Sequence, residues 1–166
     1  MPLYACTKYG LDKIRKAIAT AQTNIDSAIS MKADSGSSQD GWHDEGFKQG
    51  VSEELTWSRR IGELQGILRQ TYMADIIETD DVAGIGNGLI ITLNGAEKRF
   101  ILEGYLLEAD EKRVSIYSPL GKLLLGAKEG EEKVLVIGKK ESRIIIKKIL
   151  RPSNAESIFS RDTLSV

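Results

Sequence analysis

The sequence predicts an α+β fold: an N-terminal antiparallel coiled-coil hairpin followed by a small antiparallel β domain with a short helix. Two observations lead to this prediction. Through most of the first 70 residues, apolar or small residues recur at steps of three and four, as they do on amphipathic helices. Beyond Gln70 the period shortens to about two, or gives way to runs of β-branched residues typical of strands. We expect the hairpin over residues 1–72, the β domain over 73–150 and a polar tail over 151–166.

The composition is that of a folded protein of the cytoplasm. The chain has 166 residues, a formal net charge of −1 and one cysteine, Cys6. This charge does not favour a protein that binds nucleic acid through a broad basic face. A lone cysteine forms no internal disulfide, which fits a reducing compartment. The first residues lack the pattern of a signal peptide, and no apolar run reaches the roughly 18 residues of a membrane span, so we expect no membrane contact.

The first helix is predicted from about Thr7 to Ala33, with a narrow stripe that needs a partner. The stripe consists of Leu11, Ile14, Ile18, Ala21, Ile25 and Ala28. A break rich in Gly, Ser and Asp follows at residues 33–41 and supplies turn chemistry. Two amphipathic helices joined by such a loop pack antiparallel.

The second helix carries a similar stripe, formed by Phe47, Val51, Trp57, Ile61, Leu64 and Leu68. Its glycines are unusual, because each costs up to about 1 kcal/mol relative to alanine inside a helix. These glycines are Gly46, Gly50, Gly62 and Gly66. Two interpretations stay open: a close approach to the first helix, and a functional hinge.

The second half is predicted to contain six strands: Asp75–Glu78, Gly88–Leu93, Arg99–Leu102, Val114–Tyr117, Lys133–Ile137 and Arg143–Ile146. Turn dipeptides Asn94-Gly95 and Gly138-Lys139 lie between strand pairs, so the sheet should be mainly antiparallel. Ser118 as a cap, Pro119 at the first position and Gly126 at the stop predict a short helix between strands.

Two further segments each allow a simple interpretation. The glycine-rich residues 84–88 open no helix, so a plain loop is favoured over a phosphate-binding loop. The polar stretch 151–166 is interpreted as a loosely held tail, with a short docked helix as the alternative.

The densest group of chemically distinctive side chains lies at and after the interhelical loop, where Asp40, Trp42, His43, Asp44 and Glu45 fall within six residues. At the end of a long hairpin, these carboxylates are not desolvated and should be ordinary anions. One hypothesis is that Asp40 caps the second helix while Asp44 and Glu45 favour its N-terminal dipole. The other is that they supply part of an Mg²⁺ shell that a partner completes, with Trp42 as a contact residue.

The chain resembles the Gre family of bacterial transcript-cleavage factors, GreA and GreB, over most of residues 7–150. The most specific segment is Val114–Gly126, which contains Ile-Ser, Ser-Pro-Leu-Gly and Leu-Leu-Leu-Gly, followed by Gly130-Glu131-Glu132 before a valine-rich strand. Gre factors carry a similar series at this place. The hairpin adds Arg60-Ile61-Gly62-Glu63-Leu64, similar to their Arg-Ile-x-Glu-Leu.

The resemblance implies a coiled coil that enters the secondary channel of RNA polymerase and an FKBP-like C-terminal domain that docks at the channel rim. It places polymerase docking at Ser118, Pro119, Leu120 and Gly121. The tip carboxylates Asp40, Asp44 and Glu45 would then assist catalysis, with Asp40 and Asp44 as ligands of an Mg²⁺ shared with the polymerase. Backtracked nascent RNA would be met only inside that complex. By this resemblance the chain would be an accessory factor in transcription elongation and transcription regulation, and not an enzyme. The resemblance also implies an association with DNA.

The tip departs from the Gre pattern at one position. An ungapped comparison from Arg60 backwards keeps the first acid at Asp40 but puts His43 where the family has its second acid. This favours, as an alternative, a Gre-fold regulator or inhibitor that binds polymerase without promoting cleavage. A peptidyl-prolyl isomerase and a coiled-coil adaptor are more remote alternatives.

Overall fold

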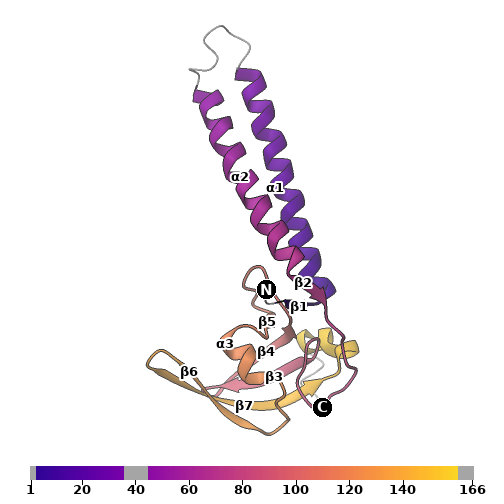
Figure 1. Cartoon of the computed structure of the whole chain (residues 1–166). Helices are drawn as coiled ribbons and strands as arrows, with labels where there is room; N and C mark the ends of the chain where they lie inside the picture. The colour runs from indigo at the N-terminus through magenta and orange to yellow at the C-terminus, as the bar shows by residue number, and fades with distance from the viewer. Residues whose placement is uncertain (1–2, 36–44, 161–166) are drawn as a thin grey trace. The chain divides into compact units, whose positions relative to one another are not determined.

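The structure of the chain, a computed structural model, describes residues 3–35 and 45–160 (Figure 1). Contacts along the chain divide it into two units. One unit comprises Leu11–Thr71, and the other combines Leu3–Gly10 with the residues from Tyr72 onward. The first unit is therefore inserted between two pieces of the second.

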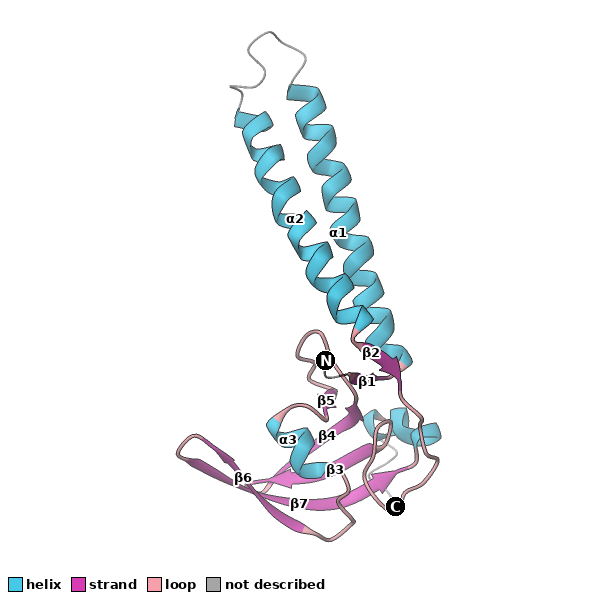
Figure 2. Ribbon diagram, viewed as in Figure 1, coloured by secondary structure: helices cyan, strands magenta, loops and turns pink. Residues whose placement is uncertain are grey.

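The first unit is a pair of antiparallel helices, α1 (Lys8–Ser35) and α2 (Glu45–Arg69), drawn in cyan in Figure 2. Four residues of the predicted α1 stripe are buried, namely Leu11, Ile14, Ala21 and Ala28. The other two, Ile18 and Ile25, are half-buried. On α2, Leu64 is fully buried, and an ion pair joins Lys32 of α1 to Glu54 of α2. The two predicted helices are confirmed.

Gly50 is a glycine of α2 that lies directly against α1. A Cβ atom added to Gly50 would lie 2.7 Å from Lys32 Cγ and 3.0 Å from the Ala28 carbonyl oxygen. A Cβ on Gly62 would meet nothing within 4 Å, and one on Gly66 only the Arg69 guanidinium at 3.9 Å. The close-approach interpretation is confirmed at Gly50 and is wrong at Gly62 and Gly66.

Alanine substitutions at Gly50 and Gly62 are expected to change the stability of the hairpin in opposite directions. Gly50→Ala should lower the free energy of unfolding by about 1–2 kcal/mol, because the new methyl group overpacks the interface. Gly62→Ala should raise it by about 0.5–1 kcal/mol through helix propensity alone. Urea unfolding followed by the helical circular-dichroism signal measures both. Shifts of the same sign would contradict the assigned packing.

The second unit contains a five-stranded sheet with the strand order β5-β4-β3-β7-β6. Its strands are β3 (Gly88–Leu93), β4 (Ala96–Glu103), β5 (Arg113–Ser115), β6 (Glu132–Ile137) and β7 (Lys140–Leu150). Every pair is antiparallel except β4–β5, which is parallel, so the sheet is mixed. Both predicted hairpin turns are present, and Asn94 and Gly95 have φ values of 51° and 86°, as a two-residue hairpin turn requires.

The main core lies between one face of the sheet and the short helix α3 (Pro119–Leu124). Fully buried side chains in this core include Leu89, Ile91, Leu102, Leu124 and Ile144. A smaller cluster on Ile90, Ile101 and Leu150 is covered by η2, a 3₁₀ helix over Pro152–Phe159.

Two sequence predictions need correction in this unit. Residues 152–159 were predicted to be a loosely held tail, but Ile158 is completely buried and the alternative of a docked helix is correct. The proline that resists a strand suits the first turn of a helix. The predicted strand Asp75–Glu78 does not form; Ile77 is 71% exposed, and Thr79 N–H bonds back to the Ile77 carbonyl at 2.9 Å. An Ile-Ile pair alone offers too little alternation to be buried in a sheet.

Beside the large sheet, β1 (Tyr4–Cys6) pairs with β2 (Thr71–Met73). The N-terminal segment fits closely onto the second unit, since a Cβ on Gly104 would lie 2.2 Å from the Ala5 carbonyl oxygen. Tyr105 N–H also donates to that oxygen at 2.7 Å, and Ala5 N–H donates to the Tyr117 hydroxyl at 2.8 Å. Residues 3–10 are therefore an integral part of the C-terminal unit.

Candidate functional site

Most of the predicted tip lies outside the described residues. Asp40, Trp42, His43 and Asp44 belong to the segment 36–44, so their roles stay predictions. Glu45, the remaining predicted carboxylate, is the first residue of α2 and its side chain is 91% exposed. Lys48 Nζ lies 3.4 Å from its Oε1, an exposed pair that leaves the carboxylate accessible to a partner.

The end of α1 and the start of α2 flank this segment, and both helices belong to one unit. Lys32 and Glu54 form an ion pair between α1 and α2, with side chains 27% and 32% exposed. Gly50 packs beside the same lysine. The packing near Lys32 therefore holds α1 and α2 together within one turn of the end of α1.

The predicted docking series Ser118–Gly121 forms the start of α3 and has a clear local role. Ser118 Oγ accepts a hydrogen bond from Gly121 N–H at 3.0 Å and donates one to the Ser115 carbonyl at 2.6 Å. A Cβ on Gly121 would lie 1.8 Å from that carbonyl oxygen, so only glycine fits. Leu120 packs against the main core, whereas Pro119 is exposed. Within this series, Pro119 is the residue with the most surface to offer a partner.

Ser118→Ala should lower the free energy of unfolding by about 1–2 kcal/mol, because α3 loses its N-cap and the Ser115 carbonyl loses a donor. Ser58, an exposed residue of α2, is a matched control, and Ser58→Ala should change stability by less than about 0.5 kcal/mol. Thermal and urea unfolding measure both variants. Equal effects would show that the cap has no energetic role.

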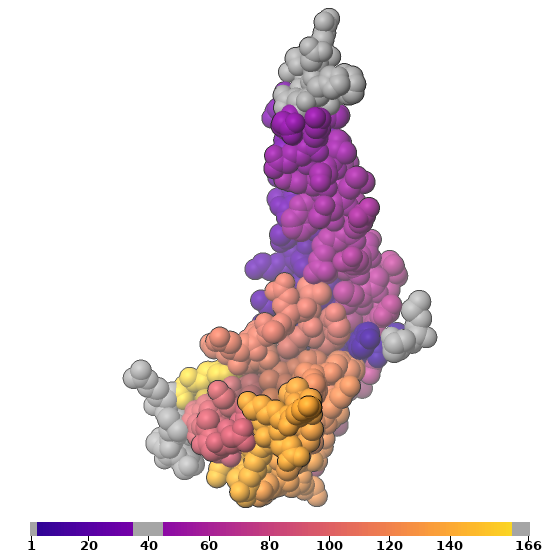
Figure 3. All heavy atoms as spheres, turned by 90° about the vertical axis from the view of Figure 1, so that its left-hand side faces the viewer, coloured from indigo at the N-terminus to yellow at the C-terminus, as the bar shows by residue number. Residues whose placement is uncertain are grey.

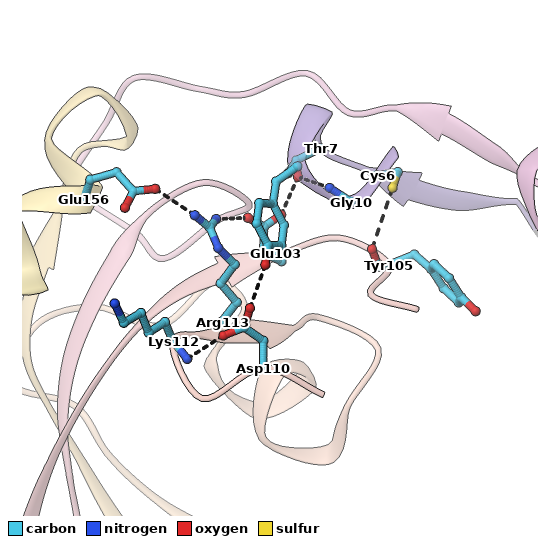
Figure 4. A network of polar contacts seen from close by, with 10 residues as sticks. Cys6, Thr7, Gly10, Glu103, Tyr105, Asp110, Lys112, Arg113 and Glu156 are labelled. Atoms are coloured by element: carbon cyan, nitrogen blue, oxygen red, sulfur yellow. Dashed lines mark hydrogen bonds and ion pairs between the residues drawn. The ribbon is translucent and has the colours of Figure 1, made fainter. Parts of the chain in front are cut away.

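A buried polar network that the sequence did not predict occupies the second unit (Figure 4). Its centre is Glu103, whose side chain is 3% exposed and lies between the Thr7 hydroxyl and the Arg113 guanidinium. Thr7 Oγ1 also accepts from Gly10 N–H at 3.2 Å, as an N-cap of α1 does. The carboxylate is thus held by one cation and by a hydroxyl at the start of a helix.

Arg113 extends the network in two further directions. Its Nη2 lies 2.7 Å from Glu156 Oε1 of η2, and its guanidinium carbon lies 3.8 Å from the centre of the Tyr9 ring. The Tyr9 hydroxyl donates to Asp110 at 2.6 Å, and this hydrogen bond raises the pKa of Tyr9 above its usual value. The network therefore connects the N-terminal segment, β4, β5 and η2.

The chemistry of this network is structural. Burial, together with the charge of Glu103, raises the pKa of the Cys6 thiol to about 11, so the thiol is protonated and unreactive at neutral pH. Cys6 Sγ instead donates to the Tyr105 carbonyl. The sequence signal for the network was Glu103 at the end of the apolar run Phe100–Leu102, because a carboxylate that continues a buried strand needs a cation.

Within residues 3–35 and 45–160, no group of three or more His, Cys, Asp or Glu side chains converges on a possible metal position. The described helices also include none with the length and apolar character required to cross a bilayer.

The described residues define an α+β protein with a long helical hairpin and a curled mixed sheet. No family model and no curated protein matches the sequence. Among solved structures, the chain is similar to the GreA factor homolog 1 (Gfh1) of Thermus thermophilus, with 21% identity, a TM-score of 0.41 and coverage of 90% of this chain and 99% of that one.

Two other solved structures are also similar to the chain. Gfh1 of Thermus aquaticus has 22% identity and a TM-score of 0.42, with coverage of 90% of this chain and 99% of that one. The transcription elongation factor GreA/GreB of Nitrosomonas europaea has 22% identity and a TM-score of 0.37, with coverage of 58% and 86%.

Proposed function

We propose that this chain is a Gre-like accessory factor that binds RNA polymerase through the secondary channel and supports Mg²⁺-dependent cleavage of backtracked nascent RNA. The observation that carries the proposal is the hairpin, in which two long helices are joined by an acidic segment. With 28 residues, α1 is about 42 Å long at 1.5 Å per residue. A narrow hairpin of this length can bring carboxylates to a site enclosed within another protein.

The proposed chemistry needs both partners. Mg²⁺ prefers six oxygen ligands in a near-octahedral shell, and the tip offers only the carboxylates of Asp40, Asp44 and Glu45. The polymerase would complete the shell and hold the other metal, and the two ions would activate water and stabilise the leaving oxygen. The chain would act in the cytoplasm without a catalytic centre of its own.

The C-terminal unit would supply the docking surface at the channel rim. Support comes from the resemblance of Val114–Gly126 to the Gre series and from the exposure of Pro119 beside the rigid start of α3. Since Ser118, Leu120 and Gly121 hold the helix in place, they would act by presenting Pro119 rather than by extensive contact of their own. The FKBP-like class of this unit is part of the same proposal.

A second function, polymerase regulation without cleavage, is favoured by one feature of the tip. His43 stands where Gre factors have their second acid, and neighbouring residues on a helix point about 100° apart. Asp44 would therefore not simply replace the missing carboxylate. In this version the hairpin would occupy the channel and exclude other factors.

The cleavage assay uses stalled, backtracked elongation complexes with Mg²⁺ and the purified chain. We expect the transcripts to shorten, and Asp40→Ala to slow this shortening by at least about tenfold, since one tenfold step corresponds to only 1.4 kcal/mol. Asp12→Ala is the matched control, because Asp12 is an exposed aspartate near the other end of α1. Loss of activity in both variants would point to a defect other than a missing metal ligand.

Competition with a genuine cleavage factor separates the two functions. Unchanged transcripts together with inhibition of the second factor would establish the regulator and remove the cleavage proposal. Unchanged transcripts without competition would overturn the polymerase proposal as a whole.

A further inference from the structure

We propose that one face of the distal half of the hairpin, formed by Ile29, Val51 and Leu55, binds the wall of the polymerase channel, at a polymerase surface that is apolar and bordered by a basic side chain. The distal half comprises residues 23–34 and 45–56, and the three residues are called the distal apolar face. The inference rests on the proposed function, because it names the part of the hairpin that would contact the polymerase. It applies equally to cleavage and to regulation without cleavage, since it concerns binding and not the chemistry of the acidic segment.

The distal apolar face contains the large apolar side chains that are exposed among the described hairpin residues, 11–35 and 45–71. Ile29 is 47% exposed, Val51 38% and Leu55 57%. Figure 3 is turned so that α2, purple to magenta, faces the viewer, and its distal turns are open on this side. Single exposed apolar residues are common on proteins, so their significance depends on whether they share one face.

Ile29 and Val51 lie on the same side of the seam, the line along which α1 and α2 touch. A Cβ atom on Gly50 would lie 3.0 Å from the Ala28 carbonyl oxygen, so these two residues oppose each other in the seam. Successive residues of a helix point about 100° apart, so Ile29 and Val51 turn out of the seam by the same angle. Because the helices are antiparallel, this rotation carries both side chains to the same side.

Leu55 extends this face along α2. It lies one turn from Val51 and directly follows Glu54, which forms an ion pair with Lys32 across the seam. Leu55 therefore turns out of the seam toward the same side as Val51.

The opposite side of the distal half has a different character. It is formed by the residues that directly precede the seam positions, and all but one of them are polar. They are Asn24, Ser27 and Met31 on α1, and Gln49, Glu53 and Thr56 on α2. The distal half is therefore two-sided, with its exposed apolar surface on one side.

The hairpin packs without burying the distal apolar face. The seam beside it is formed by small residues such as Ala28 and Gly50, together with the ion pair between Lys32 and Glu54. Full burial of a Val, Leu or Ile side chain contributes about 1.5–3 kcal/mol relative to exposure. A partner that covers this face would gain part of that free energy at each of the three positions.

The charges of the distal half indicate the chemistry of the partner. Residues 23–34 and 45–56 contain five carboxylates and two lysines, and both lysines already pair with carboxylates of the hairpin. Asp26 borders the distal apolar face, one turn from Ile29, and its Oδ1 accepts a hydrogen bond from the neutral Gln22 amide at 3.2 Å. An apolar surface bordered by a carboxylate is complementary to an apolar surface bordered by Lys or Arg. A second copy of this chain is a poorer occupant, because two distal halves of net negative charge would repel each other.

Substitution of Leu55 tests the surface. Leu55→Asp should raise the dissociation constant for RNA polymerase by at least about tenfold, because it puts a second carboxylate into a contact that is apolar and already acidic at its border. Thr56→Asp is the matched control: it adds the same charge at the next residue, which is exposed and belongs to the polar side, and should change the constant by less than about twofold. Fluorescence anisotropy of the labelled chain titrated with polymerase measures both. Equal effects of the two variants would overturn the proposal.

A folding defect can be separated from a binding defect. Because Leu55 is more than half exposed, Leu55→Asp should change the free energy of unfolding by less than about 0.5 kcal/mol in urea. Leu55→Ser, which removes the apolar contact without adding charge, should still weaken binding by at least about threefold. Normal binding by this neutral variant would show that the apolar contact is absent.

Substitution of Asp26 tests the basic border of the partner. Asp26→Lys should raise the dissociation constant by at least about threefold in about 0.1 M salt, and the difference should shrink in about 0.5 M salt, where exposed charges are screened. Asp12→Lys is the matched control, since Asp12 is exposed and lies two heptads earlier on the same side of α1. Equal weakening by both variants, or no effect of Asp26→Lys, would contradict a basic side chain beside the distal apolar face.

The same measurements distinguish failure of this inference from failure of the proposed function. If the unsubstituted chain does not bind polymerase, both are overturned. If it binds and Leu55→Asp binds equally well, only the distal apolar face is overturned. At saturating concentration, Leu55→Asp should act on the polymerase as the unsubstituted chain does, because the defect lies in affinity.

Sedimentation equilibrium of the free chain tests the other occupant. We expect the mass of one chain, 18.3 kDa, for the unsubstituted protein and for Leu55→Asp. A dimer of the unsubstituted chain that Leu55→Asp dissociates would make this face an interface between copies and overturn the proposal.

Discussion

Gly121→Ala is expected to reduce the free energy of unfolding of the second unit by more than about 3 kcal/mol, through severe overpacking of a position with no spare volume. The Cβ atom would lie 1.8 Å from the Ser115 carbonyl oxygen and 2.8 Å from Ile116 Cα, so the backbone of α3 must move away from β5. The movement would also break the hydrogen bond from Gly121 N–H to Ser118 Oγ. Urea unfolding monitored by hydrogen exchange of β3 and β7 amides measures the loss.

Gly62→Ala provides the control for this experiment, since it is the same chemical change at a helical glycine with no neighbour within 4 Å. Exchange of the β3 and β7 amides should be unaffected by it. If Gly121→Ala behaved like this control, the close contact between α3 and Ser115 would be refuted.

Glu103→Gln is expected to lower the free energy of unfolding by about 3–5 kcal/mol, the usual cost of removing one partner from a buried ion pair. The amide keeps the shape of the side chain but leaves the Arg113 guanidinium, with a side chain 14% exposed, without its buried counter-charge. Glu156, another anion that pairs with Arg113, is 74% exposed. The N-terminal segment should loosen as well, which exchange of the Tyr105 amide would detect through its bond to Ala5.

Glu156→Gln is the matched control, because it removes a carboxylate from the same guanidinium at the solvent-exposed end. An exposed pair contributes about 0–1 kcal/mol, so the effect should be several times smaller. A comparable loss in both variants would show that burial of Glu103 has no particular energetic weight.

The elements that the sequence predicted well are those that depend on nearby residues. The stripe from Leu11 to Ala28 repeats with a helical period, and Ser118, Pro119 and Gly126 mark the ends of α3 through capping and turn chemistry. The α+β class, the hairpin of helices and the mainly antiparallel sheet followed from such local signals.

What the sequence did not predict depends on residues that are distant along the chain. Glu103 is 96 positions from Thr7, and neither residue type indicates the other. The docking of η2 through Ile158 was predicted only as an alternative, because a few apolar residues in a polar stretch do not reveal which surface they cover. At the tip, the residue types predicted an acidic segment. Whether its carboxylates cap a helix or bind a metal depends on a partner and stays a prediction.

The division of the C-terminal unit between two stretches of sequence has a consequence for synthesis and engineering. On the ribosome, residues 3–10 emerge before β4 and β5 and must wait for these strands before they can complete their fold. Prior folding of residues 11–71 would shorten the effective tether between the two pieces and reduce the entropy cost of closure. A fragment that begins at residue 72 would lack the Thr7 hydroxyl that binds Glu103. Conversely, Ala74 N–H lies 2.9 Å from the Cys6 carbonyl, so excising the hairpin and joining the pieces with a short linker should yield an autonomous β domain.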